Sequence, residues 1–267
     1  MAPETPGDTE RSFYEATARH YDPAYAADRR LNDLAFWLEL AGRHGGPILE
    51  VACGTGRVLL PIARSGVPID GVDLSPEMLG VLKAKLAREP EEVRRRVALH
   101  EGDMRELHLG QAYGLVIAPF RSLQHLRTVD DQQRAFTSIA RHVAPGGCFA
   151  FNVFYPDYRF LEELGTETQE LEWTDPDDAS LEVRRFYRRK AVDWLQQLID
   201  GEFIFRSYRD GVLIHEERSG LRMSYYTYPH LQLLLRYSGL TIAEEYGSFA
   251  KELIARRHEM IIIARKE

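Results

Sequence analysis

The 267-residue chain has little of several features that mark common classes of protein. Its only two cysteines, Cys53 and Cys148, do not have the paired spacing of a metal site. No apolar run reaches the 18 residues of a membrane helix, and no apolar leader begins the chain. With 34 basic and 41 acidic residues, the formal charge is −7, which gives no basic excess for a nucleic-acid backbone. We therefore expect a cytoplasmic protein with reduced thiols, no metal, no membrane association and no nucleic-acid partner.

Apolar strand-like runs alternate with helix-like segments along most of the chain. The runs cover residues 47–51, 69–72, 97–100, 115–118, 148–154, 241–245 and 259–264. The helical candidates between them cover residues 57–64, 76–87, 130–142 and 229–237. Strands that are apolar along their length and alternate with helices are typical of a mostly parallel sheet covered on both faces. The sequence therefore predicts an α/β fold with a doubly wound, Rossmann-like sheet.

Two regions depart from this alternation. Near the N-terminus, helical patterns cover residues 10–21 and 23–42, with Asp22 as the expected N-cap of the second helix. Residues 180–228 are rich in aromatic and β-branched residues, and Asp210-Gly211 is a strong hairpin signal, so this region predicts three antiparallel strands. The expected organisation is an N-terminal helical lid at 1–42, a cofactor-binding core at 43–179, a β insert at 180–228 and the end of the core at 229–267. We expect the insert either to roof the carboxyl ends of the main sheet or to pack and support a homo-oligomer.

The stretch ILEVACGTGRVLL, residues 48–60, joins a strand to a helix through a turn that contains Gly54 and Gly56. Such a turn leaves backbone N–H groups and the positive end of a helix beside the strand tip. The third glycine of a nicotinamide-binding fingerprint is missing. Asp73 ends the next strand, about 20 residues on, where an acid can accept hydrogen bonds from both hydroxyls of a ribose. Asp103-Met104 ends the strand after that, and this pair suits the amine and the face of an adenine.

Five segments, in this order and spacing, resemble the successive motifs of class I S-adenosylmethionine-dependent methyltransferases. They are LEVACGTGRVLLPIA, GVDLSPEMLGVLKAKL, HEGDMREL, LVIAPFRSLQHL and HVAPGGCFAFNVF. The resemblance covers residues 11–154 well and the last two strands moderately. It implies a seven-stranded sheet with an antiparallel last strand, and S-adenosylmethionine as a cofactor that lies across the strand tips of the first half of the sheet. The chain departs from the pattern at Ala52, where many members have glycine, and alanine there is compatible with binding.

The resemblance also implies roles for single residues. Glu50 would organise the turn and bind the methionine amino group, Asp73 would bind the ribose hydroxyls, and Asp103 would hold the adenine amine. The other cofactor-binding residues that it implies are Ala52, Gly54, Gly56 and Arg57 in the turn, Leu74, Met78, Gly102 and Met104 around the adenine, Ala118 and Phe120 on the sulfonium side, and Tyr21. The alternative for Glu50 and Asp73 is a capping or solvated acid, and for the two methionines it is core packing.

Two residues are candidates for catalysis. A sulfonium is already an activated methyl donor, so catalysis needs an aligned acceptor and, for an amine or hydroxyl, a group that removes a proton. His125 follows the fourth strand and can accept a proton at neutral pH. Tyr14 lies seven residues before Tyr21, on the same face of the first predicted helix, and the pair could cover the cofactor and align an amine. The structural alternatives are a hydrogen bond between His125 and a loop carbonyl, and aromatic packing of the tyrosines.

The acceptor is the least determined part of the prediction. If strand alternation places Arg222 and Tyr226 on one face of the insert, that face could bind an anionic small molecule. By analogy with the family, we expect methyl transfer to an amine nitrogen of a small metabolite, such as an amino sugar or an amino acid. An O-methyltransferase, a cofactor-binding module without activity, and a nicotinamide-dependent oxidoreductase remain as alternatives.

Overall fold

The computed structural model describes residues 20–28, 32–255 and 259–267, which divide into two compact units. The core unit contains Asp33–Pro156 and Tyr225–Glu267. The insert unit contains Asp157–Ser224 together with the described residues up to Asn32. This division differs from the expected one, because the chain leaves the core after Pro156 rather than near residue 180.

The core unit is built on a seven-stranded sheet with the strand order β10-β11-β5-β4-β1-β2-β3. Neighbouring strands are parallel except that β11 runs antiparallel to both β5 and β10. The strands are β1 (Ile48–Val51), β2 (Ile69–Asp73), β3 (Val97–Glu101), β4 (Tyr113–Ala118), β5 (Val143–Phe154), β10 (Leu240–Tyr246) and β11 (Glu259–Lys266). Each of the seven apolar runs lies on one of these strands, so the predicted α/β fold is confirmed.

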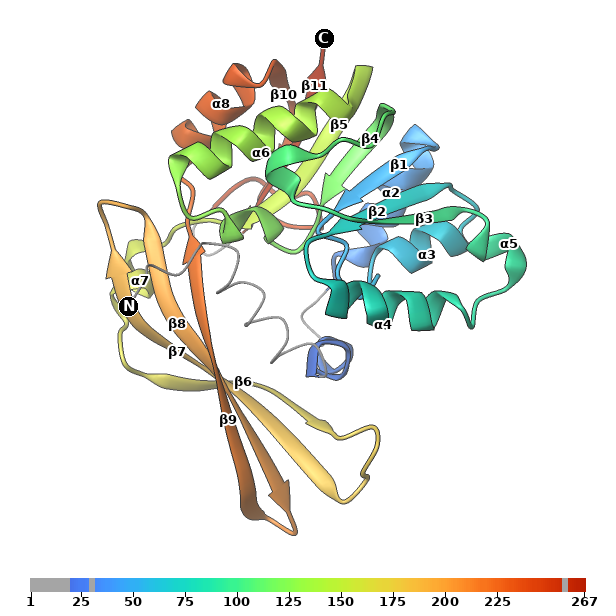
Figure 1. The fold of residues 1–267 in the computed structure, drawn as a ribbon. Helices are drawn as coiled ribbons and strands as arrows, with labels where there is room; N and C mark the ends of the chain where they lie inside the picture. The colour runs from blue at the N-terminus through green and yellow to red at the C-terminus, as the bar shows by residue number, and fades with distance from the viewer. Residues whose placement is uncertain (1–19, 29–31, 256–258) are drawn as a thin grey trace, which may run out of the picture. The chain divides into compact units, whose positions relative to one another are not determined.

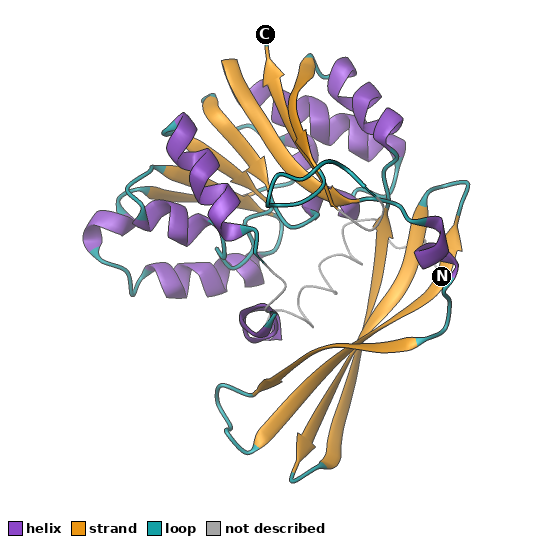
Figure 2. Cartoon of the chain, turned by 180° about the vertical axis from the view of Figure 1, so that it is seen from behind, coloured by secondary structure: helices purple, strands orange, loops and turns teal. Residues whose placement is uncertain are grey.

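Helices cover both faces of this sheet (Figure 2). One face packs against α2 (Leu34–His44), α3 (Leu59–Arg64), α4 (Pro76–Leu86) and α5 (Glu91–Arg94), and the other packs against α6 (Val129–His142) and α8 (Tyr228–Tyr237). On α6, Phe136 is fully buried and meets the rings of Phe149 and Phe151 nearly edge to face. Aromatic contacts of this kind add to the free energy gained from burial of apolar area, which holds the helix on the sheet.

The predicted second helix is wrong in its position. Residues 20–27 form one helical stretch that runs through Asp22-Pro23, and the next helix, α2, begins only at Leu34. Asp33 precedes α2, but its side chain does not cap the helix. It accepts a hydrogen bond from Trp37 Nε1 at 3.1 Å and is paired with Arg57. The periodicity of residues 23–42 therefore reflects two separate helical segments.

The insert unit carries a four-stranded antiparallel sheet in the order β6-β7-β8-β9 (Figure 1). Its elements are α7 (Tyr158–Glu162), β6 (Glu167–Thr174), β7 (Leu181–Asp193), β8 (Leu198–Arg209) and β9 (Val212–Ser224). The predicted hairpin at Asp210-Gly211 is confirmed, since both residues have positive φ, 50° and 76°, as a tight turn between twisted strands requires. The prediction missed β6 because this edge strand buries only Leu171 and Trp173 and is otherwise acidic and polar.

Candidate functional site

The carboxyl ends of β1, β2 and β4 meet at the point where the strand order reverses. β1 pairs with β2 on one side and with β4 on the other, and all three run in the same direction. In open α/β sheets, ligands bind outside the carboxyl ends of the strands at such a switch point. These three strands and the segments that follow them contain most of the predicted site residues.

The turn after β1 is shaped by three residues with positive φ: Ala52 at 56°, Gly54 at 53° and Gly56 at 81°. At Gly56 a Cβ atom would lie 2.3 Å from Leu82 Cδ1 of α4, so the close approach of the turn to that helix requires glycine. Ala52 adopts the left-handed conformation without being glycine. That alanine there is compatible with cofactor binding stays a prediction. The N–H of Gly54 donates to Asp73 Oδ2 at 2.7 Å, so the turn is tied to the end of β2.

Glu50 is a buried acid at the end of β1. Its side chain is 3% exposed, and Oε2 has no hydrogen-bond partner among the residues that the structure describes. Burial raises the pKa of Glu50 well above its ordinary value, and Asp33 and Asp73 add to this effect while Arg57 opposes it. An unpaired buried carboxylate costs free energy unless it gains a cationic or hydrogen-bonding partner. The site therefore fits a ligand that brings a cation, such as an amino group, to Glu50.

Asp73 is 9% exposed at the tip of β2. In addition to Gly54, it binds the N–H of Ser75, which donates to Oδ1 at 2.9 Å. Burial raises the pKa of Asp73, and the hydrogen bonds from Ser75, Gly54 and Leu74 oppose that effect. Each carboxylate oxygen has a second lone pair, so both oxygens can still accept a hydroxyl. Asp73 thus holds the turn and also presents two acceptors, as binding of two ribose hydroxyls would need.

Arg57, at the start of the segment leading into α3, does not lie free in the turn. Its two terminal nitrogens donate to the two oxygens of Asp33, each at 2.7 Å, and its guanidinium lies 5.0 Å from the centre of the Phe120 ring. Asp33 is 1% exposed, so this is a bidentate ion pair with one buried partner. Arg57 therefore connects the start of α2 to the segment after β4, and its side chain acts here as a support for the turn.

Asp103 is the N-cap of the short helix η1 (Met104–Glu106) and is engaged by Arg105. Arg105 Nε lies 2.9 and 2.8 Å from the two carboxylate oxygens, and Arg105 also donates to Asp131 at 3.2 Å. Partial burial alone would raise the pKa of Asp103, but the hydrogen bonds from Arg105 outweigh it and lower the pKa. The sequence analysis missed Arg105. The i, i+2 pairing of an acid and a base at a strand end is the signal that could have indicated it.

The other predicted adenine neighbours differ in their burial. Met78 is 1% exposed in α4, whereas Leu74 and Met104 are half-buried, and Met104 packs against the core. Gly102 donates its N–H to the Asp73 carbonyl oxygen at 3.0 Å, and a Cβ there would lie 3.1 Å from Val72 Cγ2. Gly102 therefore lets the ends of β2 and β3 approach closely. Ligand binding by Met78 and Met104 stays a prediction beside the packing role that was its alternative.

The β4 tip segment, residues 119–125, follows β4 and ends in the short helix η2 (Ser122–His125). It carries Phe120 and His125, whereas the side chain of Ala118, on the strand itself, is fully buried in the core. His125 is partly buried. Burial, with a smaller contribution from the positive charge of Arg127, lowers the pKa of His125 to about 4. The imidazole is thus neutral at pH 7 and able to accept a hydrogen bond.

Three other predicted residues lie outside the core unit or outside the described residues. Tyr14 lies outside the described residues. Tyr21 belongs to the insert unit, where its ring meets Tyr25 at 4.5 Å between centroids. Arg222 is on β9 and pairs with Asp200 at 3.2 Å on an exposed face.

The expectation that Arg222 and Tyr226 share one strand face is wrong. β9 ends at Ser224, and Tyr226 belongs to the core unit, where it is fully buried. Its hydroxyl donates to the Leu123 carbonyl oxygen at 2.7 Å. The reason is that the large apolar ring and its hydroxyl are both satisfied inside the core, so the strand pattern stops two residues before Tyr226.

Comparison with known proteins agrees with this geometry. Residues 48–147 match the family model described as a methyltransferase domain. Residues 48–147 are thus similar to a methyltransferase domain, and the core unit has the class I methyltransferase fold. The family resemblance stated from the sequence motifs is thereby confirmed.

Two curated relatives and one solved structure are similar to the chain. It is 32% identical to a dTDP-3-amino-3,4,6-trideoxy-alpha-D-glucopyranose N,N-dimethyltransferase of Streptomyces venezuelae. This match extends over 123 residues and covers 46% of this chain and 48% of the relative. It is 34% identical to a dTDP-3-amino-3,6-dideoxy-alpha-D-glucopyranose N,N-dimethyltransferase of Streptomyces fradiae. This second match extends over 119 residues and covers 45% of this chain and 44% of the relative. The chain thus spans about half the length of these relatives. The CcbJ methyltransferase from Streptomyces caelestis has the same fold, with a TM-score of 0.78 and 24% identity over 97% of this chain and 98% of that one.

The part of the chain that the structure describes lacks two features. No group of three or more histidine, cysteine, aspartate or glutamate side chains there is arranged to hold a metal ion. Within the same residues, no helix of the methyltransferase domain or the insert unit is long and apolar enough to cross a membrane.

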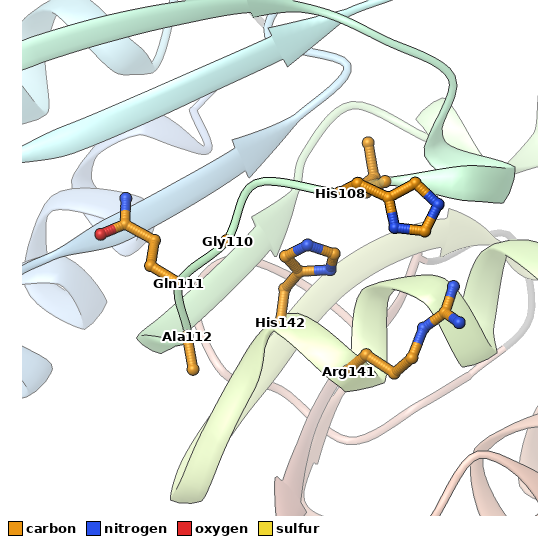
Figure 3. Close-up of a pocket in the computed structure, with 7 residues that line it drawn as sticks. His108, Gly110, Gln111, Ala112, Arg141 and His142 are labelled. Carbon is orange, nitrogen blue, oxygen red and sulfur yellow. The ribbon is translucent and has the colours of Figure 1, made fainter.

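A surface hollow of about 540 Å³ lies away from the predicted site (Figure 3). It is lined by the loop before β4, including His108 and Gln111, and by Arg141 and His142 at the end of α6. Because this loop leads into β4, the hollow lies at the amino end of that strand, whereas Phe120 and His125 follow its carboxyl end. None of the predicted site residues lines it.

Proposed function

We propose that the protein is an S-adenosylmethionine-dependent methyltransferase that methylates an amine nitrogen of a small-molecule acceptor. The observation that carries the proposal is the buried Glu50, whose Oε2 has no hydrogen-bond partner among the described residues. It lies next to a turn whose Gly54 N–H donates to Asp73. Two carboxylates at adjacent strand tips suit a ligand with an amino group at one end and a ribose diol beyond it. A nicotinamide cofactor offers no amino acid moiety for Glu50.

In this function, the chain binds and orients both substrates. When bound, S-adenosylmethionine supplies a methyl group that is already activated by the positive sulfur. Glu50 would accept hydrogen bonds from the amino group, Asp73 from the ribose hydroxyls and Asp103 from the adenine amine. His125, neutral at pH 7, would accept a hydrogen bond from the acceptor N–H and take its proton as the new C–N bond forms. Alignment of the acceptor would supply the larger part of the rate enhancement.

An amino sugar is the acceptor class that we favour. The two curated relatives are named for N,N-dimethylation of dTDP-linked amino sugars, and the family match, residues 48–147, includes the glycine turn, β2 and the β4 tip. A hydroxyl acceptor is the alternative. A direct test is mass-spectrometric detection of methylated product with a panel of dTDP-amino sugars, free amino sugars and their hydroxyl counterparts.

The cofactor prediction can be tested without knowledge of the acceptor. S-adenosylmethionine and its demethylated product should each raise the melting temperature, because a ligand that binds only the folded state stabilises it. NAD should leave the melting temperature unchanged. Thermal shift measurements at increasing ligand concentration check this, and equal shifts with NAD, or none with either sulfur compound, would contradict the assignment.

The role of Asp73 can be tested by calorimetry. Asp73→Ala should weaken binding of S-adenosylmethionine by roughly 1.5–3 kcal/mol, because charge-assisted hydrogen bonds to the ribose are lost. The N–H groups of Gly54 and Ser75 also lose their acceptor, so a small loss of stability is expected as well. Asp70→Ala is a matched control, since Asp70 is on the same strand but near its amino end. An unchanged dissociation constant for Asp73→Ala would mean that this acid only supports the turn.

A further inference from the structure

Phe120 and Arg121 are two consecutive residues with left-handed backbone, at φ of 59° and 62°, and neither is glycine. They lie in the β4 tip segment, directly after the strand. For residues with a Cβ atom this conformation costs free energy, and it persists only where the surrounding structure holds it. Specific contacts with neighbouring elements must therefore hold these two residues in this conformation.

Side chains from two neighbouring strands hold them. Asn152, on β5, is 3% exposed, and its Oδ1 accepts the N–H of Phe120 at 2.8 Å. Asn152 Nδ2 in turn donates to Glu259 Oε2, on β11, at 2.9 Å. Glu259 also accepts from Arg121 Nε at 3.0 Å. The chain of contacts thus runs from Phe120 to Asn152, on to Glu259 and back to Arg121.

Two more contacts hold the rest of the same segment. The N–H of Phe154 donates to Gln124 Oε1 at 3.2 Å, and Gln124 is fully buried. Tyr226 donates to the carbonyl oxygen of Leu123. The β4 tip segment is thus held to β5, to β11 and to the chain just before α8, and its end residue is His125. In contrast, Glu50 and Asp73 are on β1 and β2 and take no part in these contacts.

We propose that Asn152 and Glu259 are positioning residues for methyl transfer: they hold Phe120 and Arg121 in the left-handed conformation and thereby place Phe120 and His125 at the reacting groups. This inference rests on the proposed function. Neither residue touches the acceptor in this role. Both act through the backbone of the β4 tip segment, so they should affect mainly the turnover number. Cofactor affinity should change less, because only Phe120 among the displaced residues is expected to contact the cofactor.

The proposal can be tested by exchanging the hydrogen-bond donor and acceptor between positions 152 and 259. Asn152 must accept from Phe120 and donate to Glu259. In Asn152→Asp the second oxygen meets the Glu259 carboxylate, and two like charges at this separation repel each other. The double variant Asn152→Asp with Glu259→Gln restores a donor opposite an acceptor, with the same net charge as the wild-type pair. Glu259→Gln alone keeps an acceptor oxygen for Asn152 and should have the smaller effect.

We expect Asn152→Asp to lower kcat by about 10- to 100-fold, since a displacement of about 1 Å is enough for such a loss. The dissociation constant for S-adenosylmethionine should change much less than kcat, because Glu50 and Asp73 keep their positions and only the contact of Phe120 is altered. Hydrogen exchange in peptides that cover residues 119–126 should become faster in the single variant. The double variant should recover much of the turnover and of the protection from exchange.

Tyr113→Phe serves as the control, because it removes a partly buried hydrogen bond to Asp70, 2.7 Å long, at the opposite end of β4. It should change stability but neither kcat nor exchange at the tip. Full turnover in Asn152→Asp, or a double variant that recovers neither turnover nor protection, would overturn the positioning role. A wild-type protein that transfers no methyl group to any acceptor would overturn the proposed function instead.

Discussion

Replacement of His125 by alanine should lower kcat by roughly 10²- to 10⁴-fold and leave the affinity for S-adenosylmethionine nearly unchanged. The physical reason is that a positioned base stabilises the transition state by accepting the proton that the amine loses, and binding of the cofactor makes no use of it. Steady-state kinetics with saturating cofactor, together with calorimetry, measure the two effects separately. His108→Ala is a matched control, since His108 is exposed on the loop before β4.

The pH dependence adds a second measurement on the same residue. Because burial lowers the pKa of His125 to about 4, the imidazole gains a proton only as the pH falls through that value. A protonated imidazole cannot accept a proton, so the limb of the rate profile that His125 causes should lie near pH 4 and be absent in His125→Ala. An unperturbed histidine would place this limb near 6.5. The profile should be followed down to the lowest pH at which the protein stays folded.

One outcome would assign the catalysis to alignment alone. An amine acceptor titrates by itself, and its own limb would persist in His125→Ala. If both His125→Ala and Tyr14→Phe keep the wild-type kcat, neither candidate acts as a base, and the neutral His125 only lines the site. Tyr14→Phe should cost less than His125→Ala if His125 is the base, and the reverse order would move the role to Tyr14.

Glu50→Gln should weaken binding of S-adenosylmethionine by roughly 2–5 kcal/mol, the usual cost of removing one partner of a buried charge pair. The substitution keeps the size of the side chain and removes its charge. Binding of a cation at Glu50 favours the ionised carboxylate, so wild-type binding should also release protons, whereas binding by the variant should not. Calorimetry in two buffers with different ionisation enthalpies measures both the affinity and the released protons.

The same variant should make the free protein more stable at neutral pH. The pKa of Glu50 in the folded protein is raised above its ordinary value of 4.5. The protonated form therefore contributes to the free energy of unfolding, and this contribution is complete below pH 4.5. It is lost as the pH rises through the raised pKa, because the buried carboxyl must then ionise. Glutamine avoids this loss. The difference in melting temperature between Glu50→Gln and the wild type should therefore grow with pH above 4.5.

Glu39→Gln is a control, because the pKa of Glu39 is shifted in the direction opposite to that of Glu50. Hydrogen bonds from Lys251 and Arg43 lower the pKa of Glu39, so this substitution should not raise the melting temperature at neutral pH. It should also leave cofactor binding unchanged. A Glu50→Gln protein that binds the cofactor as tightly as the wild type, with no gain in stability, would mean that Glu50 is a structural acid.

Several features of the fold follow from local sequence because they depend on local physics. The inner strands of the core are buried on both faces, and this makes β1, β4 and β11 apolar runs that periodicity can identify. Asp210-Gly211 specifies a hairpin because both residues tolerate positive φ. Conversely, the edge strand β6 was missed because its exposed positions are acidic and polar.

The candidate site could be predicted from the local sequence only in part. The positions of Glu50, Asp73 and Asp103 at strand ends follow from the order of strands and turns. Their charge states do not, since the partner of Asp103 is Arg105, the partner of Asp73 is the N–H of Gly54, and Glu50 has an oxygen without a partner among the described residues. For Tyr226, the strand pattern suggested a face of the insert shared with Arg222. In the structure its ring is buried in the core, where its hydroxyl donates to the Leu123 carbonyl oxygen.

The sequence by itself determined the α/β class, the glycine turn, the acids at the strand tips and the hairpin of the insert, because propensity, periodicity and turn chemistry act over a few neighbouring residues. Only the tertiary structure decided which groups are paired, how far burial lowers the pKa of His125, and that Asn152 meets Glu259, 107 residues away. Such contacts depend on the register between strands that lie far apart in the chain, and a periodic pattern carries no information on which distant residues a register brings together.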